Sequence, residues 1–242
     1  MKPLDLRLYL VTDEACLHHQ TLLDAVEEAL QAGVTLVQYR EKNGLGRVML
    51  EKAKALRELC HRYHVPLIVN DRLDIALLSG ADGVHLGQED IPVSEAKRMA
   101  DLFFANSASS FKMENAAMNA VESNIKDEQQ QPGSSFIIGA TAHNVAEALA
   151  AEAAGADYLG CGAVFATTTK RDTVPLGLEG LRAIRQTVHI PIVGIAGVTA
   201  KNYRQVLATG ADGAAVVSAI LGAADITAAV KGFLGKANQI VY

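Results

Sequence analysis

Charged and polar side chains close an apolar run early in the chain, at residues 33–42. Gly33, which can end a helix, precedes residues 34–37, whose composition is typical of a buried strand. Side chains alternate along a strand, so Gln38, Arg40 and Lys42 would share one face. Two cations and an amide on one face could hold an anion. A strand that runs out into a solvated loop would have the same composition, so this stretch alone leaves both interpretations open.

Two aspartates follow later apolar runs and could hold a metal ion. Asp71 comes directly after residues 67–70, and Asp90 follows residues 83–86 across a short turn. If these runs are neighbouring parallel strands, both carboxylates lie at the same edge of the sheet. Mg²⁺ is usually bound by one or two carboxylates together with waters and substrate phosphate oxygens. The alternative is structural, because Asp71 could cap the next helix and the turn before Asp90 could need its polar residues for its own conformation.

Four further segments have hydroxyl groups, glycines or cations where a phosphate group could bind. Thr141 follows the apolar run 136–140 and could donate to a phosphate oxygen or cap the following helix. Residues 167–171 place three threonines before two cations, which would suit an anion clamp or an ordinary solvated loop. Residues 194–198 and 216–220 combine a glycine with the start of a short helix, the usual phosphate site of a barrel. A glycine-rich turn followed by a serine cap, without any bound phosphate, would have the same sequence.

The elements that would position these residues alternate regularly. The phrase Ala-Gly-Val or Gly-Ala-Asp recurs around Gly33, Gly80, Gly155 and Gly210, each time after a helical segment and before a short apolar run. A second series of apolar runs follows prolines, and a proline is tolerated at the start of a strand. The two series interleave into eight strands separated by amphipathic segments. This pattern predicts an α/β fold, a single-domain (β/α)8 barrel over residues 1–242, with a doubly wound open sheet as the alternative.

The glycine spacing also predicts an insertion. The steps between the four glycines are 47, 75 and 55 residues, so the middle step is longer by 20 to 28. The excess falls at about residues 103–135, after a fourth helix predicted at 94–101 and before the fifth strand. Its polar composition favours an excursion with a helical piece near 113–125. It leaves the barrel at the face opposite the expected active site, which favours a tolerated decoration over a lid.

Composition excludes several classes of protein. The net charge of −5 argues against a nucleic-acid binder. Three scattered cysteines without metal-ligand spacing indicate free thiols in a reducing compartment. No signal segment and no apolar run of about 18 residues are present, so we expect a cytoplasmic protein without a membrane span. The partners would be small molecules, and the sequence leaves open whether the chain forms a homo-oligomer.

The assembled motifs resemble those of the thiamine-phosphate synthase family. The resemblance covers nearly the whole chain except the insertion. It rests on six ordered motifs at residues 38–42, 70–71, 87–90, 167–170, 194–198 and 217–218. It implies a Mg²⁺-dependent transfer of the 4-amino-2-methylpyrimidin-5-ylmethyl group from its diphosphate to thiazole phosphate. The products would be thiamine phosphate and pyrophosphate.

The resemblance also implies roles for particular residues. Asp71 and Asp90 would hold one Mg²⁺ per subunit. The catalytic residues would be Arg40, Lys42, Thr141 and Lys170. The pyrimidine diphosphate would bind to Gln38, Tyr39, Arg40, Glu41, Lys42, Asn70, Thr141 and Lys170. The thiazole phosphate would bind to Thr167, Thr168, Thr169, Gly197, Val217 and Ser218. No Ser-His-Asp or Cys-His arrangement has supporting spacing, so catalysis would depend on positioning and charge stabilisation of a carbocation-like step.

The chain departs from the family pattern at two positions. Thr141 stands where serine is usual and keeps the hydroxyl, and Ala166 replaces a proline before the threonine segment. Two other functions remain as alternatives. One is a thiazole tautomerase-like barrel, and the other is a non-catalytic regulatory barrel that binds thiazole phosphate. The retained second aspartate and the residues 167–170 favour the synthase over both.

Overall fold

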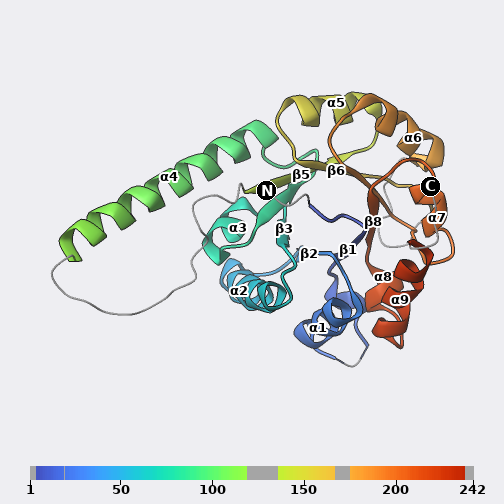
Figure 1. Ribbon diagram of the computed structural model, residues 1–242, viewed down its shortest axis with the longest axis horizontal. Coiled ribbons are helices and arrows are strands. Elements are labelled where there is room, and N and C mark those ends of the chain that lie inside the picture. The colour runs from blue at the N-terminus through green and yellow to red at the C-terminus, as the bar shows by residue number, and fades with distance from the viewer. Residues whose placement is uncertain (1–3, 19, 119–135, 167–174, 238–242) are drawn as a thin grey trace.

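Eight parallel strands form a closed barrel in the order β1 to β8, with helices around the outside (Figure 1). This computed structural model describes residues 4–18, 20–118, 136–166 and 175–237. The strands are β1 Leu8–Val11, β2 Leu36–Tyr39, β3 Leu67–Asn70, β4 Gly83–Leu86, β5 Ile137–Ala142, β6 Tyr158–Cys161, β7 Ile192–Ile195 and β8 Gly213–Val216. The barrel closes because β1 pairs with both β2 and β8. The predicted (β/α)8 fold is confirmed, and the open-sheet alternative is wrong.

The helices follow the strands in the predicted alternation. They are η1 Glu14–Cys16, α1 Leu22–Ala32, α2 Gly46–Arg62, α3 Leu73–Ser79, α4 Val93–Met118, α5 Val145–Ala153, α6 Gly177–Thr187, α7 Tyr203–Leu207, α8 Ser218–Leu221 and α9 Ile226–Ala237. Gly33 and Gly80 end α1 and α3 in the left-handed conformation, with φ of 112° and 71°. Gly33 and Gly80 therefore have the C-cap role that the sequence predicts. At the other two repeats the cap residues are Ala154 and Ala208, and Gly155 and Gly210 follow them with positive φ.

The recurring phrase has a second role that its spacing did not reveal. The residue two positions after each glycine accepts a hydrogen bond from the backbone N–H of the first or second residue of the preceding strand. Three of these acceptors are carboxylates: Asp82 to Leu67 N (2.8 Å), Asp157 to Ile138 N (2.7 Å) and Asp212 to Ile192 N (2.9 Å). The fourth is the Thr35 hydroxyl, which accepts from Leu8 N at 3.0 Å. Each phrase therefore satisfies a strand-end donor at the amino-terminal face of the barrel.

Inward and outward side chains make two separate apolar clusters. The barrel interior is filled by Leu6, Tyr9, Val11, Leu36, Ile68, Tyr158, Val193 and Ala215. A larger cluster packs the outer face of the strands against the helices. Gly83 and Gly213 face the interior at positions with no room for a side chain. A Cβ added to Gly83 would lie 2.1 Å from the Ile137 carbonyl oxygen, and one added to Gly213 would lie 1.8 Å from the Leu6 carbonyl oxygen. This filled interior places any open site at the barrel rim rather than within the barrel.

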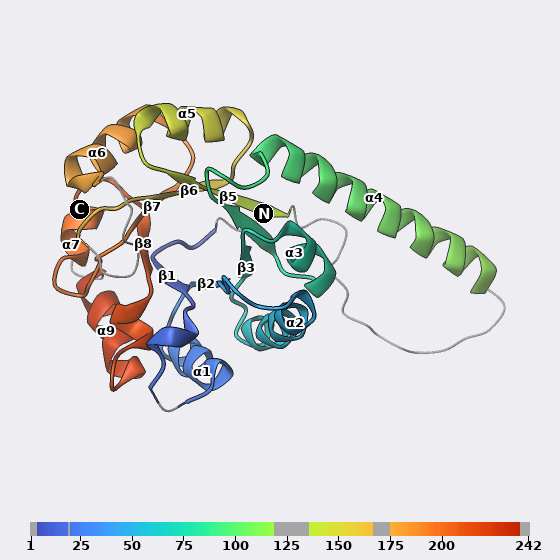
Figure 2. The same cartoon turned by 180° about the vertical axis from the view of Figure 1, so that it is seen from behind.

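The fourth helix is much longer than the sequence predicts. It was expected to end at residue 101, but α4 continues without a break to Met118 and extends well beyond the barrel in both views (Figures 1 and 2). The first half of the predicted insertion is therefore a continuation of this helix. The rest of it, residues 119–135, lies outside the described residues.

Candidate active site

Arg40 lies at the carboxyl-terminal end of β2, held by residues from β1 and the segment after it. Its backbone N–H donates to the Thr12 hydroxyl at 2.9 Å, and its guanidinium lies 3.7 Å from the Asp13 carboxylate. Thr12 is fully buried. Sequence reasoning identified Arg40 but missed Thr12 and Asp13, because nothing local links the end of the first strand to the end of the second. Their contact follows from the pairing of Val11 with Gln38.

Asp71 and Asp90 meet at the same rim, as the sequence predicts. Asp71 is held in the left-handed conformation, with φ of 62°, and its N–H donates to the His85 carbonyl at 2.8 Å. The Asp90 carboxylate accepts from Gly87 N at 2.6 Å. Neither aspartate is a helix cap, since Arg72 caps α3 and does so without a side-chain hydrogen bond. The capping alternative for Asp71 is therefore wrong.

The two carboxylates interact directly. Desolvation, the hydrogen bond to Asp90 and the charge of Asp90 raise the pKa of Asp71 from 3.8 to about 6, although the residue as a whole is exposed, and the nearby Arg40 opposes the rise. Two like charges in contact are stabilised when a divalent cation lies between them. Among the described residues, no three His, Cys, Asp or Glu side chains form a complete metal site. The pair therefore fits an ion such as Mg²⁺ that takes its remaining ligands from water and substrate.

A pocket of about 360 Å³ adjoins the carboxylate pair. It is lined by Asn70, Asp71 and Arg72 from the end of β3, and by Lys42 and its neighbours from the segment after β2. Arg72 is paired with Asp74, with its Nε 2.8 Å from that carboxylate. Lys42 is exposed at the pocket. A polar pocket with Lys42 and the Asp71 carboxylate in its lining could hold a phosphate group together with a cation.

Gln38 and Thr141 lie lower on the barrel wall, on strands far apart in the chain. Gln38 is 4% exposed, and its amide Nε2 donates to the Tyr9 hydroxyl at 2.6 Å. The Thr141 hydroxyl lies 3.0 Å from His85 Nε2. Thr141 belongs to β5, and Asn144 caps α5 instead, so the capping alternative for Thr141 is wrong. Tyr9 and His85 were not identified from the sequence; their inward positions on β1 and β4 were the available signal.

Tyr39 and Glu41 differ in their position at the rim, since Tyr39 is buried and Glu41 is part of the pocket lining. The Tyr39 side chain is 1% exposed and belongs to the cluster between the sheet and the helices. Only its backbone could contact a ligand at the rim. The Glu41 carboxylate accepts from Asn43 N at 3.1 Å and lies 3.8 Å from the Lys52 ammonium. These contacts suit a supporting role for both residues.

The ends of β6, β7 and β8 form the other side of the rim. Gly197 has φ of 66°, and a Cβ there would lie 2.5 Å from the Ala166 carbonyl oxygen. Phe165 N donates to the Ala196 carbonyl at 3.1 Å, which ties the end of β6 to the end of β7. Val217 precedes α8, and Ser218 is its first residue, without a side-chain cap. Thr167, Thr168, Thr169 and Lys170 lie outside the described residues.

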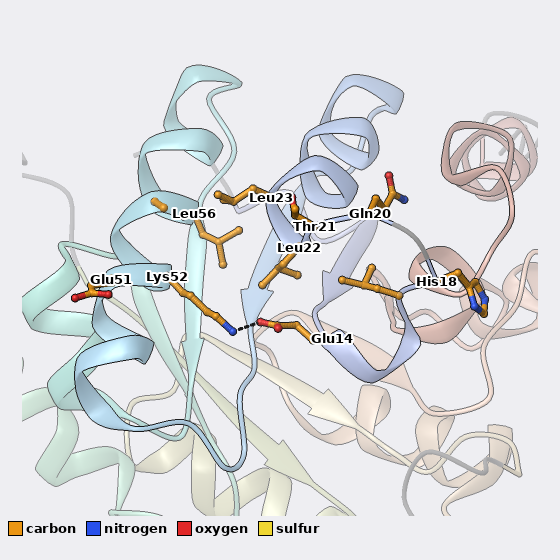
Figure 3. A pocket seen from close by; sticks show the side chains of 11 residues that line it. Glu14, His18, Gln20, Thr21, Leu22, Leu23, Glu51, Lys52 and Leu56 are labelled. Atoms are coloured by element: carbon orange, nitrogen blue, oxygen red, sulfur yellow. Dashed lines mark hydrogen bonds and ion pairs between the residues drawn. The ribbon is translucent and has the colours of Figure 1, made fainter.

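A larger depression, of about 650 Å³, lies between α1 and α2 on the outside of the barrel (Figure 3). Its lining combines leucines, among them Leu22, Leu23 and Leu56, with polar and charged residues that include Glu14, Glu51 and Lys52. Lys52 and Glu14 form an ion pair across it (Figure 3). A lining with two glutamates and one lysine, which is already paired with a glutamate, is poorly suited to a diphosphate. The smaller rim pocket is therefore the better candidate.

The fold and the polar rim define the class of protein: a (β/α)8-barrel enzyme with its candidate site at the carboxyl ends of the strands. A family model described as thiamine monophosphate synthase matches residues 8–125 and 108–220. The chain belongs to the thiamine-phosphate synthase family, transferases whose reaction releases pyrophosphate. Within the part of the chain that the structure describes, no helix has the length and apolar composition to cross a membrane.

Individual relatives cover nearly the full chain. The thiamine-phosphate synthase of Chloroflexus aurantiacus is 45% identical over 228 residues, which is 94% of this chain and 90% of that protein. The Clostridium novyi enzyme of the same name is 42% identical over 93% of this chain and 95% of its own. The solved thiamine phosphate pyrophosphorylase of Pyrococcus furiosus superposes with a TM-score of 0.80 at 38% identity, covering 99% of this chain and 98% of that one.

Proposed function

We propose that this chain transfers the 4-amino-2-methylpyrimidin-5-ylmethyl group from its diphosphate to thiazole phosphate in a Mg²⁺-dependent reaction. The products are thiamine phosphate and pyrophosphate. The observation that carries the proposal is the contact between Asp71 and Asp90 beside Arg40, at the strand ends of a barrel that belongs to this family. A carboxylate pair whose charge is neutralised by a bound Mg²⁺, next to a guanidinium, would suit a diphosphate leaving group.

The diphosphate end of the site is assigned to the rim of β2, β3 and β5. Arg40 and Lys42 supply positive charge, Asn70 and Thr141 supply neutral hydrogen-bonding groups, and Gln38 lies deeper, at the pyrimidine. Lys170 completes this set in the assignment, and Tyr39 and Glu41 support it. Asp71 and Asp90 would hold one Mg²⁺, which when bound neutralises charge on the departing diphosphate.

The thiazole phosphate is assigned to the ends of β6, β7 and β8. Gly197 and the backbone at Val217 and Ser218 would supply N–H groups near the start of α8. Thr167, Thr168 and Thr169 are assigned to the same phosphate. The two phosphate sites therefore lie on opposite sides of one rim, with the reacting atoms between them.

The reaction needs no protein nucleophile. Burial raises the pKa of both the Cys60 and the Cys161 thiols to about 12, so neither is a thiolate near neutral pH. His143 is engaged with Glu147, whose carboxylate lies 2.9 Å from its Nδ1. We propose a dissociative step in which the bond from the pyrimidine methylene carbon to oxygen breaks, with the electron pair leaving on pyrophosphate. The thiazole nitrogen then donates its electron pair to the resulting carbocation-like carbon.

One assay tests the proposal against its alternatives. Both phosphorylated precursors are incubated with the protein and Mg²⁺, and thiamine phosphate and pyrophosphate are measured together. Equimolar formation of both products, abolished by EDTA, supports the synthase. Binding of thiazole phosphate without either product would overturn it and favour a binding barrel, and isomerisation of the thiazole without pyrophosphate would favour a tautomerase.

A further inference from the structure

Five polar side chains form a continuous chain of hydrogen bonds through the barrel interior, from β2 to β5. Gln38 Nε2 donates to the Tyr9 hydroxyl at 2.6 Å, and the Tyr9 and Tyr158 hydroxyls are 2.7 Å apart. The Tyr158 hydroxyl lies 3.0 Å from His85 Nδ1, and His85 Nε2 lies 3.0 Å from the Thr141 hydroxyl. The chain therefore joins two residues assigned to the pyrimidine diphosphate from separate parts of the barrel wall.

The barrel wall leaves space for the rings in the middle of this chain. Tyr158 is fully buried, and a Cβ on Gly139 would lie 2.2 Å from its ring. A Cβ on Gly160 would lie 3.0 Å from His85 Cε1. Both glycines occupy inward positions on β5 and β6, so a larger residue at either would displace a ring. The geometry depends on side chains from five strands and is not a local motif.

The direction of the hydrogen bonds follows from Gln38, the first residue of the chain of hydrogen bonds. The Gln38 amide nitrogen can only donate, so the Tyr9 oxygen accepts from it and the single Tyr9 proton is directed to Tyr158. The Tyr158 proton then goes to His85 Nδ1, which must be unprotonated to accept it. Burial keeps both phenols protonated, because it raises the pKa of Tyr9 and of Tyr158 well above the ordinary value. His85 therefore carries its proton on Nε2 and donates it to Thr141.

We propose that this chain fixes the tautomer of His85 and thereby holds the Thr141 hydroxyl as a hydrogen-bond donor toward the bound diphosphate. Tyr9, Tyr158 and His85 are positioning residues for the transfer, and the inference rests on the proposed function. A diphosphate oxygen can only accept. With the opposite tautomer, His85 Nε2 would take the Thr141 proton, and the hydroxyl would face the ligand with lone pairs alone.

The tautomer can be measured without any substrate. Long-range proton–nitrogen NMR spectra of ¹⁵N-histidine-labelled protein distinguish an Nε2–H ring from an Nδ1–H ring, and His85→Gln assigns the signals. We expect His85 to be an Nε2–H ring. Gln38→Glu replaces the donor at the start of the chain with an acceptor, and the Nδ1–H form should then predominate. An Nδ1–H ring in the unaltered protein, or no response to Gln38→Glu, would overturn the proposal.

Kinetics test the consequence for Thr141. Thr141→Val keeps the shape but removes the hydroxyl, and kcat should fall on the order of 100-fold, whereas Thr141→Ser keeps most activity. Tyr158→Phe removes the donor to His85 together with the acceptor for Tyr9, and kcat should fall about tenfold with the KM for thiazole phosphate unchanged. Tyr158→Phe added to Thr141→Val should cost nothing further, since both act through the same hydroxyl. Multiplicative losses in the double variant would contradict the proposal.

Tyr203→Phe is the matched control. Tyr203 is also fully buried, but its hydroxyl donates to the Arg7 carbonyl outside the chain of hydrogen bonds. It should lower the melting temperature about as much as Tyr158→Phe and leave kcat unchanged. An equal loss of kcat in both variants would mean that Tyr158 acts only through packing. If the unaltered protein forms no thiamine phosphate, the proposed function fails, while the tautomer spectra still test the chain of hydrogen bonds by themselves.

Discussion

The Asp90 carboxylate lies close enough to Asp71 to raise the pKa of that carboxyl, although the two residues belong to the ends of different strands. β3 and β4 are neighbours in the barrel, with Asn70 paired to His85, so the residues that follow them emerge side by side. Arg40 lies close enough to Asp71 to oppose the rise in its pKa. One cation and two anions therefore meet where the proposed diphosphate leaves.

We expect Asp71→Asn and Asp90→Asn each to lower kcat on the order of 100-fold or more while leaving the affinity for thiazole phosphate nearly unchanged. The amide keeps the size of the side chain and removes the charge that would bind Mg²⁺. Turnover is followed by pyrophosphate release, and thiazole phosphate binding by calorimetry. Glu95→Gln, which removes an exposed carboxylate paired with Arg98 on α4, is the charge-matched control. Parallel loss of thiazole phosphate binding would show that the assignment of two separate sites is wrong.

The raised pKa of Asp71 predicts a pH dependence for metal binding. Mg²⁺ needs the ionised carboxylate, so the Mg²⁺ concentration for half-maximal turnover should fall as pH rises through about 6 and level off above 7. Without metal, the free energy of unfolding should change with pH in the opposite direction. A carboxyl pKa raised from 3.8 to about 6 means that the folded state binds the proton more tightly, so the stability contributed by protonation is lost as pH rises through this range. Asp71→Asn should flatten the pH dependence of both Mg²⁺ binding and stability. An unchanged pH profile in that variant would mean that another group titrates.

Gly197→Ala should impair the thiazole phosphate side alone. Alanine is strained at φ of 66°, and its Cβ would approach the Ala166 carbonyl at 2.5 Å, which moves the end of β6 away from β7. We expect the KM for thiazole phosphate to rise about tenfold or more, with little change in the KM for the pyrimidine diphosphate. Gly235→Ala on α9 is the control, since nothing lies within 4 Å of a Cβ there. Equal changes in both KM values would indicate a general distortion of the rim.

The strand-start carboxylates predict an effect on stability without an effect on turnover. Asp157→Ala removes the acceptor for Ile138 N and should lower the free energy of unfolding by about 1 to 2 kcal/mol. Asp157→Asn retains an acceptor and should lose less. Denaturation with urea gives the difference, and kcat per folded molecule should stay constant. A loss in kcat at full folding would mean that this face of the barrel communicates with the rim.

The barrel was predictable because its signals are local and repeated. A glycine or a proline lies a few residues before each strand. Once the strand order is known, the proximity of Asp71 and Asp90 follows from it. The interior chain of hydrogen bonds was not predictable in this way, since Tyr9 and Tyr158 are separated by 149 residues and meet only across the closed barrel. Asp13 at Arg40 was missed for the same reason. The length of α4 was missed because Asn106 and the three serines at 107–110 are typical of loops, although the alanines and the Lys-Met-Glu sequence at 112–114 favour a continuous helix.

The outer part of α4 should be dispensable for turnover. The helix is anchored to the barrel near its start, where Ala96 and Ala100 are buried and the Phe104 ring packs against Phe136 with centroids 5.9 Å apart. Beyond this anchor it projects away from the barrel (Figure 2). Deleting residues 105–133 shortens the connection between α4 and β5, whose entropic cost depends only weakly on its length. We expect kcat within about twofold of the full chain. Phe104→Ala in the full-length protein should instead lower the melting temperature, because it removes the anchor itself. Loss of turnover in the deletion variant with an unchanged melting temperature would show that the deleted segment takes part in the reaction.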